Sequence, residues 1–185
     1  MNKLTIAVCS FAIVSAAAAQ SVRPARSARS TDSVPRSIAE AEERGRRHPR
    51  LSTSPWFPAS LDSAEYVGSS ERRCVDVGSA NIARSGEFFA GPFALYPRTW
   101  AEGSGKLWWR PAVGPRPGAP TNLIVRVHRL DGVPHSLVWE GKPITSLAPT
   151  PSMLLPSNIV LPARGRWLFM ATAAENWGCF IYTLN

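Results

Sequence analysis

The stretch Asn122–Leu130, with the sequence NLIVRVHRL, indicates most clearly which class of fold this chain adopts. Leu123, Val125 and Val127 share one face of an extended chain, and the polar residues between them share the other. An alternation with a period of two residues is typical of a strand with one buried face. The Asp131-Gly132 pair that follows favours a tight turn, because both residues tolerate a positive φ. We therefore expect a strand here that ends in a turn.

Similar short runs, each bounded by Gly, Pro, Asn or Asp, recur from about Trp56 onwards. They lie at Cys74–Val77, Glu87–Leu95, Lys106–Arg110, Ser136–Trp139, Pro143–Leu147, Asn158–Leu161, Arg166–Ala173 and Gly178–Leu184. Seventeen prolines and thirteen glycines suit many short strands better than they suit a helical domain. We expect residues 56–185 to form one all-β domain, an antiparallel β-sandwich or an open barrel.

Residues 1–19 have the three-part layout of a secretory signal peptide. A short positive start is followed by the apolar run Leu4–Val14 and by small residues that end in Ala17-Ala18-Ala19. The run is shorter than the about 20 residues that cross a membrane, so we expect no transmembrane segment in the mature chain. The alternative is a lipoprotein acylated at Cys9, which Val8 disfavours. The pattern predicts a secreted or periplasmic protein.

Residues 20–55 are expected to form a disordered basic linker. The segment is rich in Ser, Ala and Arg and has no apolar period that could bury a face. One short helix is expected within it, over residues 38–47, because Ser37 followed by Glu40 forms a capping box. A helix of this length is marginal in water, so we expect it to form on contact with a surface or a partner.

The charge of the chain is positive, with 21 Lys and Arg against 13 Asp and Glu. The linker has eight arginines and four acidic residues, so it is attracted to anionic envelope lipids and acidic glycans. The alternative is a solvated tether that binds nothing. Nucleic acid is not an expected partner, because no DNA- or RNA-binding motif is present and the protein is expected outside the cytoplasm.

Two cysteines, Cys74 and Cys179, remain after removal of the signal peptide. An even pair in an oxidising compartment predicts one disulfide rather than a reactive thiol. A disulfide that closes the long loop from Cys74 to Cys179 would stabilise the folded protein by at most about 4 to 5 kcal/mol, according to the chain-entropy estimate.

The seven tryptophans are an unusual feature of this sequence. Aromatic faces form sugar-binding platforms, but aromatic side chains also dominate core packing. Trp108 and Trp109 are adjacent, so one of them is expected to face inward and the other outward. We expect the outward member, together with Trp100 and Trp177, to form an exposed ligand-binding patch.

His128, Asp131 and His135 are the candidate metal ligands, since their spacing places three ligand-type side chains near one turn. The alternative is that Asp131 serves the turn and His128 the polar face of its strand. No cofactor is predicted. A hydrolase with a dispersed active site is a further alternative, although no G-x-S-x-G elbow is present and no two carboxylates are singled out.

Three segments resemble a set of exported bacterial proteins of unknown function. They are Lys106-Leu107-Trp108-Trp109-Arg110, then Val127-His128-Arg129-Leu130-Asp131-Gly132, then Leu161-Pro162-Ala163-Arg164-Gly165-Arg166-Trp167. Those proteins share a K-x-x-W-W-R, an R-x-L-D-G and a P-x-x-G-C-W in the same order. The resemblance covers about residues 90–185. It implies an immunoglobulin-like β-sandwich behind a signal peptide or lipid anchor, and it implies no known activity. This chain has Arg166 where those proteins often have cysteine.

Taken together, the sequence predicts a non-catalytic interaction module of the cell envelope or the extracellular space. We expect it to bind glycans or anionic envelope surfaces. The secreted hydrolase and the metal-binding module remain the alternatives.

Overall fold

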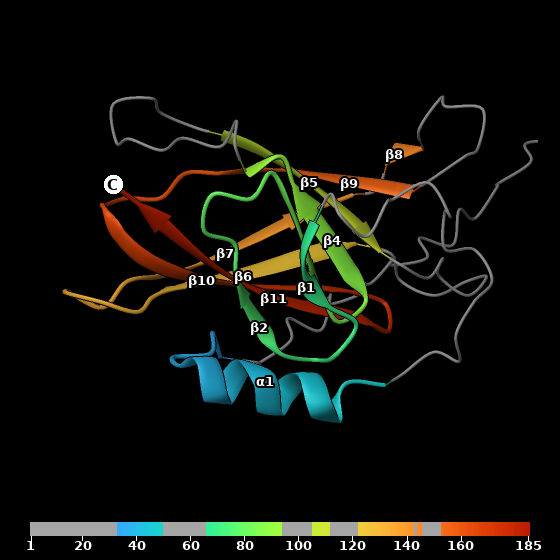
Figure 1. The fold of residues 1–185 in the computed structure, drawn as a ribbon, viewed down its shortest axis with the longest axis horizontal. Helices are drawn as coiled ribbons and strands as arrows, with labels where there is room; N and C mark the ends of the chain where they lie inside the picture. Colours follow the sequence, from blue (N-terminus) through green and yellow to red (C-terminus); the bar gives the residue numbers. More distant parts are fainter. Residues whose placement is uncertain (1–32, 50–65, 94–104, 112–121, 143, 146–152) are drawn as a thin grey trace, which may run out of the picture. The chain divides into compact units, whose positions relative to one another are not determined.

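Two β-sheets that face one another and one helix make up the part of the chain that the computed structural model describes (Figure 1). The structure describes residues 33–49, 66–93, 105–111, 122–142, 144–145 and 153–185. All of them fall within one compact unit, which extends from Ser33 to Asn185. The predicted all-β sandwich is therefore confirmed. The predicted signal peptide lies outside the described residues.

Five strands form the sheet that contains the stretch NLIVRVHRL, here called sheet B. In spatial order they are β2 (Cys74–Asp76), β11 (Asn176–Leu184), β10 (Gly165–Ala173), β6 (Leu123–Arg129) and β7 (Ser136–Gly141). Strand β2 is parallel to β11, and the other neighbours are antiparallel. As predicted, β6 places Leu123, Val125 and Val127 in the core.

Six strands form the second sheet, sheet A. In spatial order they are β1 (Tyr66–Ser69), β3 (Ile82–Ser85), β4 (Phe88–Gly91), β5 (Gly105–Pro111), β9 (Met153–Ile159) and β8 (Ile144–Thr145). The β1–β3 pair is parallel, so both sheets are mixed rather than purely antiparallel as expected. Strands β1 and β3 were not predicted from the sequence, because neither shows a clear alternation of apolar residues.

The main core lies between the two sheets. Trp109 of β5 occupies its centre, with its ring centroid 5.6 Å from Phe180 of β11 and 6.4 Å from Phe169 of β10. Its indole Nε1–H donates to Ser157 Oγ of β9 at 2.8 Å, so the one polar atom of the buried indole is satisfied. Alternate residues of β5 therefore point inward, and those between them lie on the outer face of sheet A.

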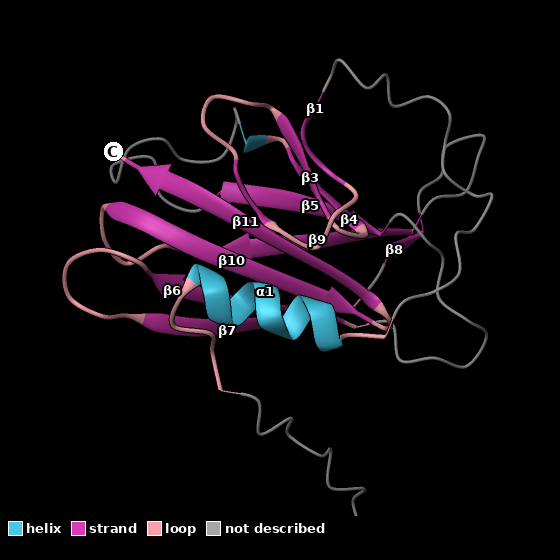
Figure 2. Cartoon of the chain, turned by 60° about the horizontal axis from the view of Figure 1, so that its bottom comes forward, coloured by secondary structure: helices cyan, strands magenta, loops and turns pink. Residues whose placement is uncertain are grey.

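Helix α1 (Ile38–Arg47) covers the outer face of sheet B (Figure 2). Its capping box is as predicted, since Ser37 Oγ accepts from Glu40 N at 3.1 Å. Ala41 is fully buried against a second apolar cluster that includes Met170 and Trp177. The sequence places this helix in the linker and begins the domain at residue 56. In the structure the helix packs on the sheet, and the compact unit begins at Ser33.

The disulfide between Cys74 and Cys179 is present, and it lies within sheet B beneath α1. The two cysteines are direct partners in the parallel pairing of β2 with β11. The bridge therefore connects neighbouring strands of one sheet. Within the described residues, no helix has the length and apolar character needed to cross a bilayer.

Candidate ligand-binding site

The four tryptophans proposed as a ligand-binding patch do not meet on one face. Trp109 is in the core between the sheets, and Trp177 is 1% exposed because α1 lies over it. Trp108 is half-buried on the outer face of sheet A, so the pair Trp108–Trp109 divides as expected. Trp100 lies outside the described residues. Of the proposed set, only Trp108 is left as a surface platform in the described part of the chain.

The three proposed metal ligands also do not share one site, because each has different contacts. His128 lies on the side of sheet B that α1 covers, where its Nδ1 is 2.7 Å from Ser136 Oγ. His135 instead contacts the edge of the Trp167 ring, which belongs to the core between the sheets. Among the residues that the structure describes, no group of three or more His, Cys, Asp or Glu side chains is placed to hold a metal.

Asp131 has a structural role in the turn, as the alternative reading predicts. Its carboxylate accepts from Arg166 N at 2.9 Å and from Arg129 Nε at 3.1 Å. The hydrogen bond from Arg166 and the charge of Arg129 lower the pKa of Asp131. Both carboxylate oxygens are therefore engaged in joining the β6–β7 turn to the start of β10.

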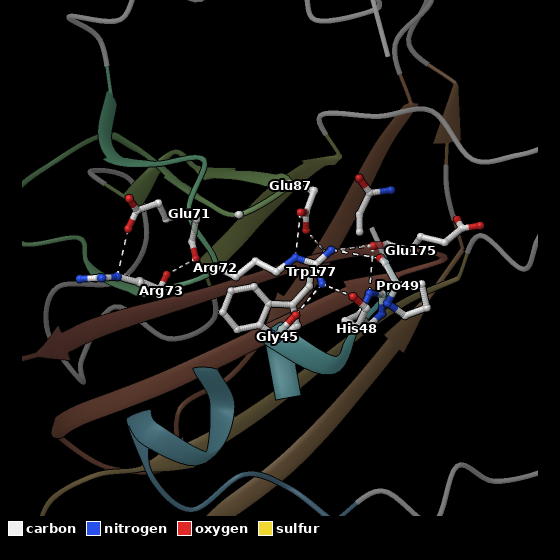
Figure 3. Close-up of polar contacts among 12 residues, drawn as sticks. Gly45, His48, Pro49, Glu71, Arg72, Arg73, Glu87, Glu175 and Trp177 are labelled. Carbon is white, nitrogen blue, oxygen red and sulfur yellow. Dashed lines mark hydrogen bonds and ion pairs between the residues drawn. The ribbon is translucent and has the colours of Figure 1, made fainter. Parts of the chain in front are cut away.

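A buried polar network beneath the C-terminal end of α1 is the most charged place in the interior (Figure 3). The Arg72 side chain is 2% exposed, and its Nε is 2.8 Å from Glu87 Oε1. The rest of its guanidinium donates to backbone carbonyls of Gly45, His48, Pro49 and Glu175. A guanidinium at this position satisfies the carbonyls that a helix leaves unpaired at its C-terminus.

His48 adds a second contact to this network. Its Nδ1–H donates to the Glu175 carbonyl at 2.9 Å, at the turn between β10 and β11. Burial and the nearby Arg72 charge lower the pKa of His48. The other oxygen of Glu87 accepts a hydrogen bond from Trp177 N at 3.2 Å. Both carboxylate oxygens of Glu87 are therefore engaged by groups of the protein. This network holds the C-terminal end of α1 on the sheet.

The outer face of sheet A is different, because its basic side chains lie beside aromatic rings. Arg84 of β3, Phe89 of β4 and Arg110 of β5 are consecutive partners across three strands. The two guanidinium carbons are each 5.2 Å from the centroid of the Phe89 ring. On the same face, Lys106 Nζ is 4.4 Å from the centroid of the Trp108 ring. Both geometries are those of cation–π contacts.

A pocket with a volume of about 240 Å³ lies next to this row. Trp108 and Gly91 are direct partners across β5 and β4, and both line the pocket together with Ile82. Pro92 and Leu154 add further apolar lining, and Arg110 is the one charged residue that lines the pocket. The pocket is thus apolar with a cation at one side.

The described strands of sheet A contribute basic residues to this face and no acidic ones. As described, the strands of sheet A contain Arg84, Lys106 and Arg110 but no Asp or Glu. In the described part of the chain, neither Lys106 nor Arg110 forms an ion pair with a carboxylate. Burial lowers the pKa of Arg110, which stays protonated because a guanidinium loses its proton only at very high pH. A half-buried cation that no carboxylate of the described residues pairs with attracts an anion strongly.

Sequence reasoning found Trp108 in this site but not its neighbours. Lys106, Trp108 and Arg110 alternate along one strand, so their common face follows from the period of two residues. That signal was available in the K-x-x-W-W-R segment. Phe89 and Gly91 come from another strand, and only the pairing of β4 with β5 brings them there.

Comparison of the chain with protein-family models, with curated proteins and with solved structures found no match in any of the three.

Proposed function

We propose that this protein is an exported, non-catalytic binding module that binds an anionic partner of the cell envelope through the outer face of sheet A. The observation that carries this proposal is the apolar pocket beside Arg110 and Lys106, on a sheet whose described strands have three basic residues and no acidic one. Charge of one sign on one face attracts a partner of the opposite charge.

Export is supported by the sequence pattern of residues 1–19 and by the disulfide, since disulfides persist in oxidising compartments. An immunoglobulin-like identity is supported by two facing sheets of short strands around a buried tryptophan. In immunoglobulin domains the disulfide joins the two sheets, whereas here it joins neighbouring strands of sheet B.

The basic segment before the sandwich supports anion binding less than its composition indicates. In its described part, the helix arginines pair with helix glutamates: Arg44 with Glu40 at 2.7 Å, and Arg47 with Glu43 at 2.9 Å. These pairs neutralise much of the charge of α1. We therefore assign the anion-binding role to sheet A rather than to the helix.

Co-sedimentation of the purified protein with lipid vesicles tests this proposal. We expect binding to vesicles that contain phosphatidylglycerol, little binding to phosphatidylcholine vesicles, and weaker binding as salt increases. The variant K106Q/R110Q should lose about 10- to 30-fold in apparent affinity, since each cation near an anionic surface is worth about 1 kcal/mol. The control variant K142Q/R164Q removes two exposed charges outside sheet A and should bind nearly as the wild type does. Equal loss in both variants would contradict the proposal.

A further inference from the structure

The lining of the pocket on sheet A discriminates between classes of ligand. A sugar ring is held by an aromatic platform together with several side chains that form hydrogen bonds to its hydroxyl groups. Here the lining side chains are Ile82, Phe89, Ala90, Pro92, Trp108, Arg110 and Leu154, with Gly91 between them. The guanidinium of Arg110 and the indole N–H of Trp108 are the polar side-chain groups in that set. The pocket therefore has room for an apolar group but few partners for sugar hydroxyls.

The position of the cations adds a second requirement. Arg110 lines the pocket, and Lys106 is on the same face of β5, above the Trp108 ring. An apolar group in the pocket therefore places whatever is attached to it beside Arg110, and Lys106 adds a second positive charge on the same face of the strand. A guanidinium forms paired hydrogen bonds with a carboxylate or a phosphate, because its N–H groups match the spacing of the two oxygens.

We propose that this pocket binds the alkyl chain of a free anionic amphiphile. Such a molecule has a single alkyl chain with a carboxylate or a similar anionic group at one end. The alkyl chain packs against Trp108, Ile82 and Leu154, and the anionic group pairs with Arg110 and Lys106. This inference rests on the proposed function, since it names the ligand class of the same face. A neutral alkyl chain lacks the ion pair, and a small inorganic anion lacks the apolar contact.

Isothermal titration calorimetry with the purified protein tests the inference, with each probe kept below its micelle concentration. Octanoate, nonanoate and decanoate should bind with affinities that rise by up to about fourfold for each added methylene, as expected for burial of one CH₂ group. Decanol and decyltrimethylammonium should bind at least tenfold more weakly than decanoate. Equal binding of decanol or of the cation, or affinity that does not depend on chain length, would overturn the inference.

Two variants locate the binding. I82W fills the pocket and keeps every charge, so it should abolish decanoate binding. R110Q keeps the pocket and should weaken decanoate binding about tenfold, so the inference stays testable if I82W does not fold. Decanoate binding unchanged in both variants would place the ligand elsewhere and overturn the inference. A protein that binds anionic vesicles but not decanoate retains the proposed function and loses this inference; a protein that binds neither loses both.

Discussion

Gly45 of helix α1 lies against the indole ring of Trp177 of strand β11, so closely that a Cβ atom on Gly45 would be 2.6 Å from the ring carbon Cε2. Glycine is a poor helix former, and its presence in α1 follows from this contact rather than from helix propensity. The absence of a side chain lets the helix approach the sheet over Trp177 and the disulfide. Helix α1 is therefore a packed element of the domain, and the following predictions test how it is held.

The G45A variant should destabilise the protein, although alanine favours a helix more than glycine does. A methyl group inside the contact distance of a buried ring forces the helix or the indole to move, which typically costs about 1 to 3 kcal/mol. Urea unfolding followed by tryptophan fluorescence measures the free energy of unfolding. The control R46A, at an exposed position of the same helix, should change it by less than about 0.5 kcal/mol. A G45A protein as stable as wild type would show that the helix is not packed as described.

Breaking the buried ion pair between Arg72 and Glu87 should be among the most damaging single changes. The R72A variant leaves the Glu87 carboxylate buried without its partner, which should lower the free energy of unfolding by about 3 to 5 kcal/mol. The R72M/E87L double variant should recover part of the loss, since it removes both charges together. The exposed pair of Arg73 and Glu71 is the matched control, and R73A should cost at most about 1 kcal/mol. Similar losses for R72A and R73A would contradict this account.

Removal of the disulfide should lower stability without changing the pairing of β2 with β11. Substitution of Cys74 and Cys179 by serine should cost about 2 to 5 kcal/mol, because the unfolded chain loses a constraint across 105 positions. Since the bridge lies under α1, the double variant should also be cleaved faster within residues 33–49 by a protease at low concentration. Unfolding in urea with and without a reducing agent measures the loss of stability. Mass spectrometry of the fragments measures the cleavage within residues 33–49.

The lowered pKa of His48 predicts that acid weakens the docking of α1. Above about pH 6.5, the ordinary pKa of histidine, the side chain is neutral in both folded and unfolded protein, and its contribution is complete. As the pH falls below this value, the unfolded chain takes up a proton before the folded protein does. The free energy of unfolding therefore decreases towards acid pH. The sign would be opposite if burial had raised the pKa.

Unfolding in urea at several values between pH 7.5 and pH 5 measures this effect. His128 contributes in the same direction, because burial and the nearby Arg36 lower its pKa. The H48Q variant should flatten part of the pH dependence and keep a donor for the Glu175 carbonyl. H48Q/H128Q should remove the contribution of both of these histidines. A double variant with the full slope of the wild type would exclude the two histidines as its source.

Much of the fold follows from local sequence, and the rest depends on contacts between distant residues. The alternation in Leu123–Arg129 and the capping box at Ser37 predict β6 and the start of α1 correctly. The docking of α1 could not be predicted, because the residues it buries are Ala41 and Gly45 rather than a stripe of large apolar side chains. Strand β9 was expected at Asn158–Leu161 but lies at Met153–Ile159.

The candidate site was likewise predicted only in part, because local sequence does not show contacts between distant residues. One strand supplies Lys106, Trp108 and Arg110, and their shared face can be read from the sequence. The pocket is lined from both strands, and the position of Gly91 opposite Trp108 is set by the pairing of β4 with β5. Trp177 was expected on the surface, but it is buried because α1 covers that face of sheet B. The packing of the helix there could not be predicted from local sequence.

The measurement that tests the central claim most directly is a titration of the protein with decanoate, followed by NMR of the tryptophan indole N–H groups. The account predicts that the Trp108 resonance shifts progressively with ligand, while those of the buried Trp109, Trp167 and Trp177 stay in place. The shift should be much smaller in the R110Q variant at the same ligand concentrations. A titration in which Trp108 does not move, or in which Trp177 moves instead, would contradict the assignment of the binding site to the outer face of sheet A.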